Sequence, residues 1–231
     1  MTVSEALNKI EERIQQACQR SGRSRQDIRL MAVSKFQDLD KIREAYAAGI
    51  RLFGESRVQE ALLKFGNTST GMEDIELHCI GHLQRNKVKT AIQLFPCIQS
   101  VDRNELITEL ALQCQKAEKK LAILLELHTG ESSKAGYPDT EALLGAVEQV
   151  LNHPELELRG LMTMAPFTKD EKPIRQSFRT LMRANQIVQQ HFPALKLDMI
   201  SMGMSNDFEI AIEEGSTLLR IGTAIFAEDE R

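Results

Sequence analysis

The sequence has few of the features that mark secreted, membrane-spanning or redox-active proteins. Its four cysteines are Cys18, Cys79, Cys97 and Cys114, with no CxxC pair and no metal-type clustering with histidine. We therefore expect buried, reduced thiols and no metal site. No hydrophobic run is long enough to span a membrane, and the N-terminal segment MTVSEALNKIEER is too charged for a signal peptide. These absences predict a cytoplasmic protein with no membrane segment.

An excess of positive charge is also lacking. The 231 residues include 29 Lys and Arg against 33 Asp and Glu, for a net charge of −4. This balance argues against nucleic acid or an anionic membrane as the main partner, although it allows a local basic pocket for a small anion. Hydrophobic residues make up 42% of the chain, which is enough for a sizeable core. The length suits one α/β barrel domain covering residues 1–231.

Short apolar runs alternate with helix-like segments along the chain. The expected strands cover residues 28–34, 51–54, 76–80, 97–101, 121–128, 155–162, 196–202 and 217–222. The clearest helices between them cover 38–48, 56–65, 84–94, 103–119, 139–151, 171–191 and 206–214. Eight strands separated by helices, with no hairpin signal, predict a single (β/α)₈ TIM barrel over residues 28–226.

An additional helix is expected ahead of the barrel, over residues 1–22. It begins with Thr2-x-x-Glu5, the spacing of a capping box, and ends near Gly22. An open doubly wound sheet is the alternative fold. Such a sheet often carries a GxGxxG turn after its first strand, and this sequence has none.

Three segments at the predicted carboxyl ends of strands carry the chemistry. Lys35 follows the first strand, residues 201–205 (SMGMS) follow the seventh, and residues 220–223 (RIGT) close the eighth. Glycines let a backbone approach a ligand, and hydroxyls and helix N-termini donate to phosphate oxygens. Phosphate sites in TIM barrels often use the loops after strands seven and eight. A lysine combined with these loops predicts a ligand with an aldehyde and a phosphate, although Lys35 alone could be a surface charge and Ser205 a helix N-cap.

The ordered motifs of the chain resemble those of the pyridoxal phosphate homeostasis proteins, also called the proline synthase co-transcribed family. These are small relatives of the alanine racemase N-terminal barrel. The resemblance rests on AVSK at 32–35, FGESRVQE at 53–60, IGHLQRNK at 80–87, SVD at 100–102, GLM at 160–162, SMGMS at 201–205 and RIGTAIF at 220–226. It implies that pyridoxal 5′-phosphate (PLP) is the cofactor and forms a Schiff base on Lys35.

The resemblance also implies the surroundings of the cofactor. Arg220 would face the pyridine nitrogen, and the phosphate side would involve Ser201, Gly203, Met204, Ser205, Gly222 and Thr223. Ser56, His82 and Met162 would lie near the cofactor. The chain departs from the family at Ser56, where asparagine is usual, at His128, and at Ala135, which follows Lys134 where serine is common.

The resemblance implies a carrier or buffer of vitamin B6, with effects on amino-acid and keto-acid balance, and no catalytic residue is assigned. An arginine at the pyridine nitrogen donates without protonating it, which makes the ring a poorer electron sink. A racemase would also need a second base, which related enzymes take from a C-terminal domain, whereas this chain stops at Arg231. The only tyrosines are Tyr46, expected to pack, and Tyr137, a candidate acid on the 128–137 loop.

We therefore expect a monomer with an open site that delivers PLP to apo-enzymes. A low-activity PLP-dependent racemase or decarboxylase is the first alternative. A cofactor-free Schiff-base aldolase is the second, and it is disfavoured because no acid–base residue is evident beside Lys35.

Overall fold

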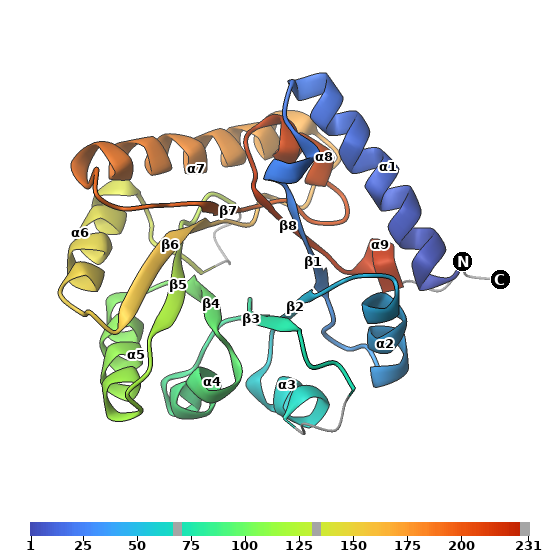
Figure 1. The fold of residues 1–231 in the computed structure, drawn as a ribbon. Helices are drawn as coiled ribbons and strands as arrows, with labels where there is room; N and C mark the ends of the chain where they lie inside the picture. The colour runs from blue at the N-terminus through green and yellow to red at the C-terminus, as the bar shows by residue number, and fades with distance from the viewer. Residues whose placement is uncertain (67–70, 131–134, 227–231) are drawn as a thin grey trace.

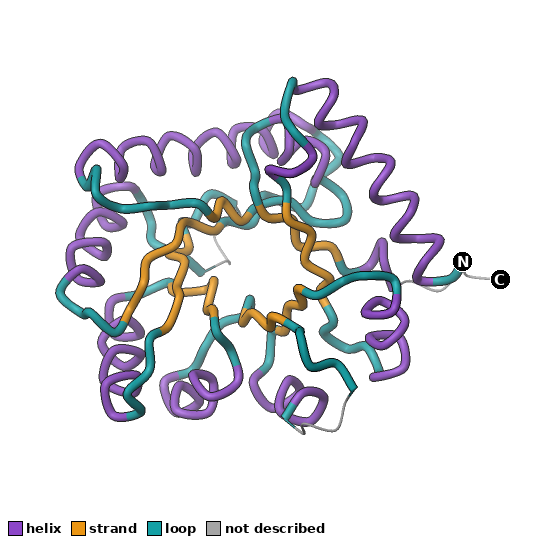
Figure 2. The backbone as a smooth tube through the Cα atoms, viewed as in Figure 1, coloured by secondary structure: helices purple, strands orange, loops and turns teal. Residues whose placement is uncertain are grey.

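The structure, a computed structural model, describes residues 1–66, 71–130 and 135–226. Parallel strands β1 to β8 form a closed barrel, in which β8 returns to pair with β1 (Figure 2). The strands are β1 (Arg29–Val33), β2 (Leu52–Glu55), β3 (Glu76–Cys79), β4 (Cys97–Val101), β5 (Leu121–Glu126), β6 (Leu156–Met162), β7 (Met199–Ser201) and β8 (Leu218–Ile221). The predicted TIM barrel is confirmed.

Helices follow the strands and surround the barrel (Figure 1). They are α2 (Leu39–Ala47), α3 (Val58–Phe65), α4 (Val88–Leu94), α5 (Asn104–Lys116), α6 (Thr140–Leu151), α7 (Glu171–His191), α8 (Phe208–Glu213) and α9 (Thr223–Phe226). Short 3₁₀ turns occupy η1 (Arg25–Asp27) and η3 (Arg85–Lys87).

The predicted leading helix is α1 (Val3–Ser21), which lies outside the barrel against α8 and α9 (Figure 1). Its capping box is formed as expected. The Thr2 hydroxyl accepts from the Glu5 N–H at 3.1 Å, and the Glu5 carboxylate accepts from the Thr2 N–H at 2.8 Å. Gly22 ends the helix with φ +66°, a conformation that glycine adopts without strain.

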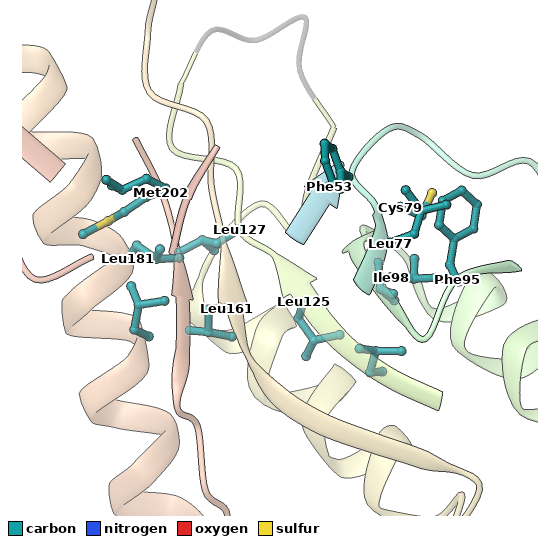
Figure 3. Close-up of a cluster of buried hydrophobic side chains, with 14 of the residues drawn as sticks. Phe53, Leu77, Cys79, Phe95, Ile98, Leu125, Leu127, Leu161, Leu181 and Met202 are labelled. Carbon is teal, nitrogen blue, oxygen red and sulfur yellow. The ribbon is translucent and has the colours of Figure 1, made fainter. Parts of the chain in front are cut away.

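Strand side chains alternate between the helix layer and the inside of the barrel. Leu77 and Cys79 of β3 belong to the large apolar cluster between strands and helices, part of which, with Leu161 of β6 and Leu181 of α7, is seen in Figure 3. The intervening positions face the barrel interior. Two small apolar clusters lie there, one formed by Met31, Leu52 and Leu218 and the other by Leu124, Met162 and Met199.

Some sequence-based helix starts differ from the structure. The predicted helix 84–94 begins as the 3₁₀ turn η3 before α4. The helix expected from residue 103 is α5, whose N-cap residue Arg103 makes no side-chain cap hydrogen bond. Ser205 is not an N-cap, because α8 begins only at Phe208. The short helix α9 was not predicted, since four residues are too few to show a helical period.

Gly160→Ala should destabilise the protein by about 3 kcal/mol, near the top of the usual cost of overpacking. A Cβ at Gly160 would lie 1.8 Å from the carbonyl oxygen of Met199, the residue with which Gly160 pairs across β6 and β7. Gly145→Ala in α6 is the control. It meets no atom within 4 Å and should stabilise by roughly 0.5–1 kcal/mol. Urea unfolding followed by circular dichroism measures both changes, and equal stabilities would contradict the packing argument.

Candidate functional site

Lys35 follows β1 and is exposed at the carboxyl ends of the strands. The residue before it, Ser34, is fully buried and is held by two side chains. Its hydroxyl donates to Oε1 of Glu55 at 2.7 Å, and its carbonyl accepts from Nζ of Lys64 at 2.8 Å. Lys64 Nζ also donates to the same Glu55 oxygen at 2.9 Å. The hydroxyl and the carbonyl of Ser34 are therefore both held by side chains of neighbouring elements. Ser34 directly precedes Lys35, the lysine predicted to bind the ligand.

Glu55, at the end of β2, is the buried centre of this cluster. Its side chain is fully buried, whereas that of Lys64 is 14% exposed. Oε2 of Glu55 has no hydrogen-bond partner among the described residues. The carboxylate consequently depends on Lys64 and Ser34 for its stabilisation, because a buried charge without partners is costly.

Arg220 on β8 holds a guanidinium almost entirely away from water, with the residue 4% exposed. Nη1 donates to Oγ of Ser201 at 2.7 Å, and Nη2 donates to the Thr163 carbonyl at 2.8 Å. Burial lowers the pKa of Arg220 to about 10, and the charges of Glu126 and Asp207 oppose that change. The side chain is therefore a cation at neutral pH.

The loops after β7 and β8 lie against each other. The Ala224 N–H donates to Oγ of Ser205 at 3.2 Å, and the Arg220 N–H donates to the carbonyl of Gly203 at 2.9 Å. Gly203 has φ +96°, and a Cβ there would lie 2.5 Å from Cβ of Ala211. The structure thus brings together the two segments that the sequence analysis assigned to a phosphate.

Two predicted residues of these loops have packing roles of their own. A Cβ on Gly222 would approach Cβ and the carbonyl oxygen of Val33 at 3.2 Å, so this glycine allows the loop after β8 to contact β1. The N–H of Met204 donates to the carboxylate of Asp207 at 2.5 Å. Thr223 is exposed at the start of α9.

The hydroxyl of Ser201 is already engaged. It accepts from Arg220 and donates to Oε1 of Gln99 at 2.6 Å, and the residue is fully buried. A phosphate contact by Ser201 stays a prediction. The observed geometry instead links its hydroxyl to the orientation of Arg220.

The remaining predicted residues lie farther around the barrel. Met162 is buried at the end of β6 in an interior apolar cluster. His82, with its side chain 56% exposed, is within 2.9 Å of the Asp102 carboxylate through Nδ1. Ser56 contacts the next loop, since a Cβ on Gly81 would lie 2.3 Å from its carbonyl oxygen. A cavity of about 430 Å³ between these loops is lined by Ser56 and His82 among others.

Tyr137 does not face the site as a free acid. Its ring is buried in the main core and its hydroxyl donates to Oδ1 of Asn104 at 3.0 Å. Burial, together with the charges of Asp102 and Glu105, raises the pKa of Tyr137. The backbone N–H of His128 donates to the Tyr137 carbonyl at 2.9 Å, which holds this part of the loop. Lys134 lies outside the described residues.

Sequence reasoning gave no role to Glu55, Lys64, Thr163 or Gln99, although all four contact Ser34, Ser201 or Arg220. The available signal was a polar residue within an apolar strand, as in CIQSV around Gln99. The described residues hold no group of three or more His, Cys, Asp or Glu side chains placed to bind a metal. Within the same ranges, no helix has the length and apolar character to cross a membrane.

Comparisons with known proteins converge on one family. Residues 6–229 match the family model described as alanine racemase, N-terminal domain. The chain is 38% identical to the pyridoxal phosphate homeostasis protein of Aquifex aeolicus over 99% of both chains. It is 37% identical to the protein of that name in Pasteurella multocida, covering 98% of this chain and 97% of the relative. PipY of Synechococcus elongatus, solved with PLP bound, superposes with a TM-score of 0.85 at 33% identity, covering 98% of this chain and 100% of PipY.

Lys64→Met should lower the free energy of unfolding by about 3–5 kcal/mol, because it leaves the buried Glu55 carboxylate without its cation. Lys89→Met, at an exposed position of α4, is the matched control and should change stability by less than about 0.5 kcal/mol. Urea unfolding measures both. A loss below about 1 kcal/mol for Lys64→Met would show that Glu55 does not depend on this lysine.

Proposed function

The chain belongs to the alanine racemase N-terminal domain family, and we propose that it binds PLP covalently through Lys35 as a carrier or buffer in vitamin B6 homeostasis. The observation that carries this proposal is that Lys35 follows β1, the strand that pairs with β8. Register pairs Ala32 with Ile221, so the chain after β1 runs next to the loop that follows Arg220. Lys35, the buried Arg220 and the hydroxyl-bearing loops thus belong to neighbouring strands or to the segments that follow them.

These residues fit the chemical groups of PLP. When bound, PLP supplies an aldehyde carbon that reacts with amines and a pyridine ring that withdraws electrons. The exposed Lys35 amine suits the aldehyde, and its backbone is held through Ser34 by Glu55 and Lys64. The names of the relatives and the PLP-bound PipY structure support the same cofactor.

Arg220 is proposed to face the pyridine nitrogen. A guanidinium only donates hydrogen bonds, so it stabilises an unprotonated ring nitrogen. It would keep the ring a weak electron sink, which suits storage better than carbanion chemistry. The pKa of about 10 keeps the side chain charged at neutral pH even in its buried position.

The loops after β7 and β8 are proposed to hold the phosphate. Ser205 and Thr223 offer hydroxyls that are not fully buried, and the link from Ser205 to Ala224 holds the two loops together. Hydrogen bonds to a charged group are worth roughly 1.5–3 kcal/mol each, so these two hydroxyls alone would favour PLP over pyridoxal. The backbone that approaches the phosphate would come from Gly203, Met204 and Gly222.

The exposure of Lys35 supports release as well as binding. We propose that apo forms of PLP-dependent enzymes are the recipients, and that the protein is a monomer of the cytoplasm. Four free, buried cysteines are compatible with a reducing compartment.

Lys35→Ala should abolish the visible absorption band that PLP gives with the wild type, and should leave stability within about 0.5 kcal/mol because Lys35 is exposed. Borohydride reduction and peptide mapping of the wild type should find the adduct on Lys35. Lys87→Ala, at the end of η3, is the control and should keep the band. An unchanged adduct level in Lys35→Ala would assign attachment to another lysine, with Lys134 examined first. A wild type that stays colourless with PLP would overturn the proposal.

The PLP-loaded protein should donate PLP to an apo-enzyme without turning over amino acids. Transfer is measured as recovered activity of the recipient. Turnover is measured as deuterium exchange at the α-carbon of alanine and other amino acids in heavy water. Exchange or racemisation at ordinary enzymatic rates, about 1–10³ per second, would replace the carrier proposal with a racemase.

A further inference from the structure

A row of hydrogen bonds crosses the inside of the barrel from Arg220 to its amino-terminal end. Beyond Ser201, Nε2 of Gln99 lies 2.7 Å from Nδ1 of His78, and Nε2 of His78 lies 2.6 Å from Oε1 of Glu76. Nη2 of Arg29 donates to the other Glu76 oxygen at 2.5 Å. Ser201, Gln99 and His78 are fully buried. These three side chains therefore find their hydrogen-bond partners within the row.

The two charged ends and the placement of the Gln99 amide together give the direction of the hydrogen bonds. Glu76 accepts from Arg29 and from Nε2 of His78, and the hydrogen bond from His78 is the main cause that lowers the pKa of Glu76 to about 2. The amide nitrogen of Gln99 lies at Nδ1 of His78, so Nδ1 accepts from it.

The amide oxygen of Gln99 consequently faces Ser201 and accepts its hydroxyl proton. At the other end Arg220 can only donate, which agrees with a lone pair of Ser201 turned toward it. A reversed Gln99 amide would point an N–H at Ser201 and leave Nδ1 of His78 facing an oxygen.

We infer that Gln99 is a positioning residue: it fixes the Ser201 hydroxyl as an acceptor and thereby aims the Arg220 guanidinium at the pyridine nitrogen. The inference rests on the proposed function for the identity of the ring. Ser201 and the Thr163 carbonyl hold the two terminal nitrogens of Arg220. Without Gln99, the proton of the Ser201 hydroxyl has no acceptor in this row. The hydroxyl then becomes free to rotate, and it no longer holds Nη1 of Arg220 in one orientation.

A matched pair of ligands tests this role. One is PLP and the other is its deaza analogue, in which a C–H replaces the ring nitrogen. The wild type should bind PLP about tenfold more tightly, the effect of one hydrogen bond. Gln99→Met should reduce this ratio to about 1–2, because it mainly weakens PLP binding. A merely structural defect would weaken both ligands equally, and that result would overturn the inference.

Two further variants separate orientation from packing. Gln99→Glu keeps an acceptor for Ser201 on one oxygen, while its other oxygen faces Nδ1 of His78, which must then be protonated together with Nε2. This variant should restore the preference for PLP. Ser100→Ala, the next residue of β4, removes a buried hydrogen bond to the Gly81 carbonyl at 2.6 Å and should reduce stability without changing the ligand ratio. A lost preference in Ser100→Ala, or in Gln99→Glu when its fold is intact, would overturn the inference.

A measurement on the wild type without cofactor does not depend on any variant folding. Nitrogen-15 NMR should show the His78 ring protonated at Nε2 and accepting at Nδ1. A proton on Nδ1 would overturn the inference while leaving the proposed function untouched. Wild-type protein that binds PLP and the deaza analogue equally would do the same. Failure to bind PLP at all would instead remove the proposed function as well.

Discussion

Arg220 imposes a requirement that much of the barrel interior meets. A guanidinium shielded from water is costly unless its donors are matched by acceptors. The structure provides these from two strand ends, through the Ser201 hydroxyl and the Thr163 carbonyl. Ser201 in turn needs an acceptor of its own, and Gln99 supplies it. One buried cation thus accounts for a polar row between two apolar interior clusters.

The closed parallel barrel makes the strands that carry this cation and precede the lysine neighbours. Pairing of β8 with β1 makes the first and last strands neighbours, so residues from opposite ends of the chain share one rim. Lys35 differs from Arg220 in being exposed, and its position is held through the preceding residue. Glu55 and Lys64 fix Ser34 from the helix side of the strand, and the amine itself stays accessible.

The contrast between these two side chains is what the proposed carrier role would use. Under that proposal, the buried Arg220 would contact the ring and the exposed Lys35 amine would allow attachment and release. Tyr137 was a candidate acid from the sequence, but its hydroxyl is engaged with Asn104 and burial raises its pKa. The candidate site therefore combines a buried cation with an exposed amine, and the hydroxyl of Tyr137 is engaged elsewhere.

The sequence by itself determined the strand order, the leading helix and the three segments that meet at the rim, because periodicity, capping spacing and glycine-rich strand ends are local signals. Motif resemblance added the expectation that PLP is bound through Lys35. Only the tertiary structure decided what supports these residues. The hydrogen bonds of Glu55, Lys64 and Gln99 join different elements, and the Ser201 hydroxyl accepts from Arg220. Partners that are distant in sequence come together only when the barrel closes.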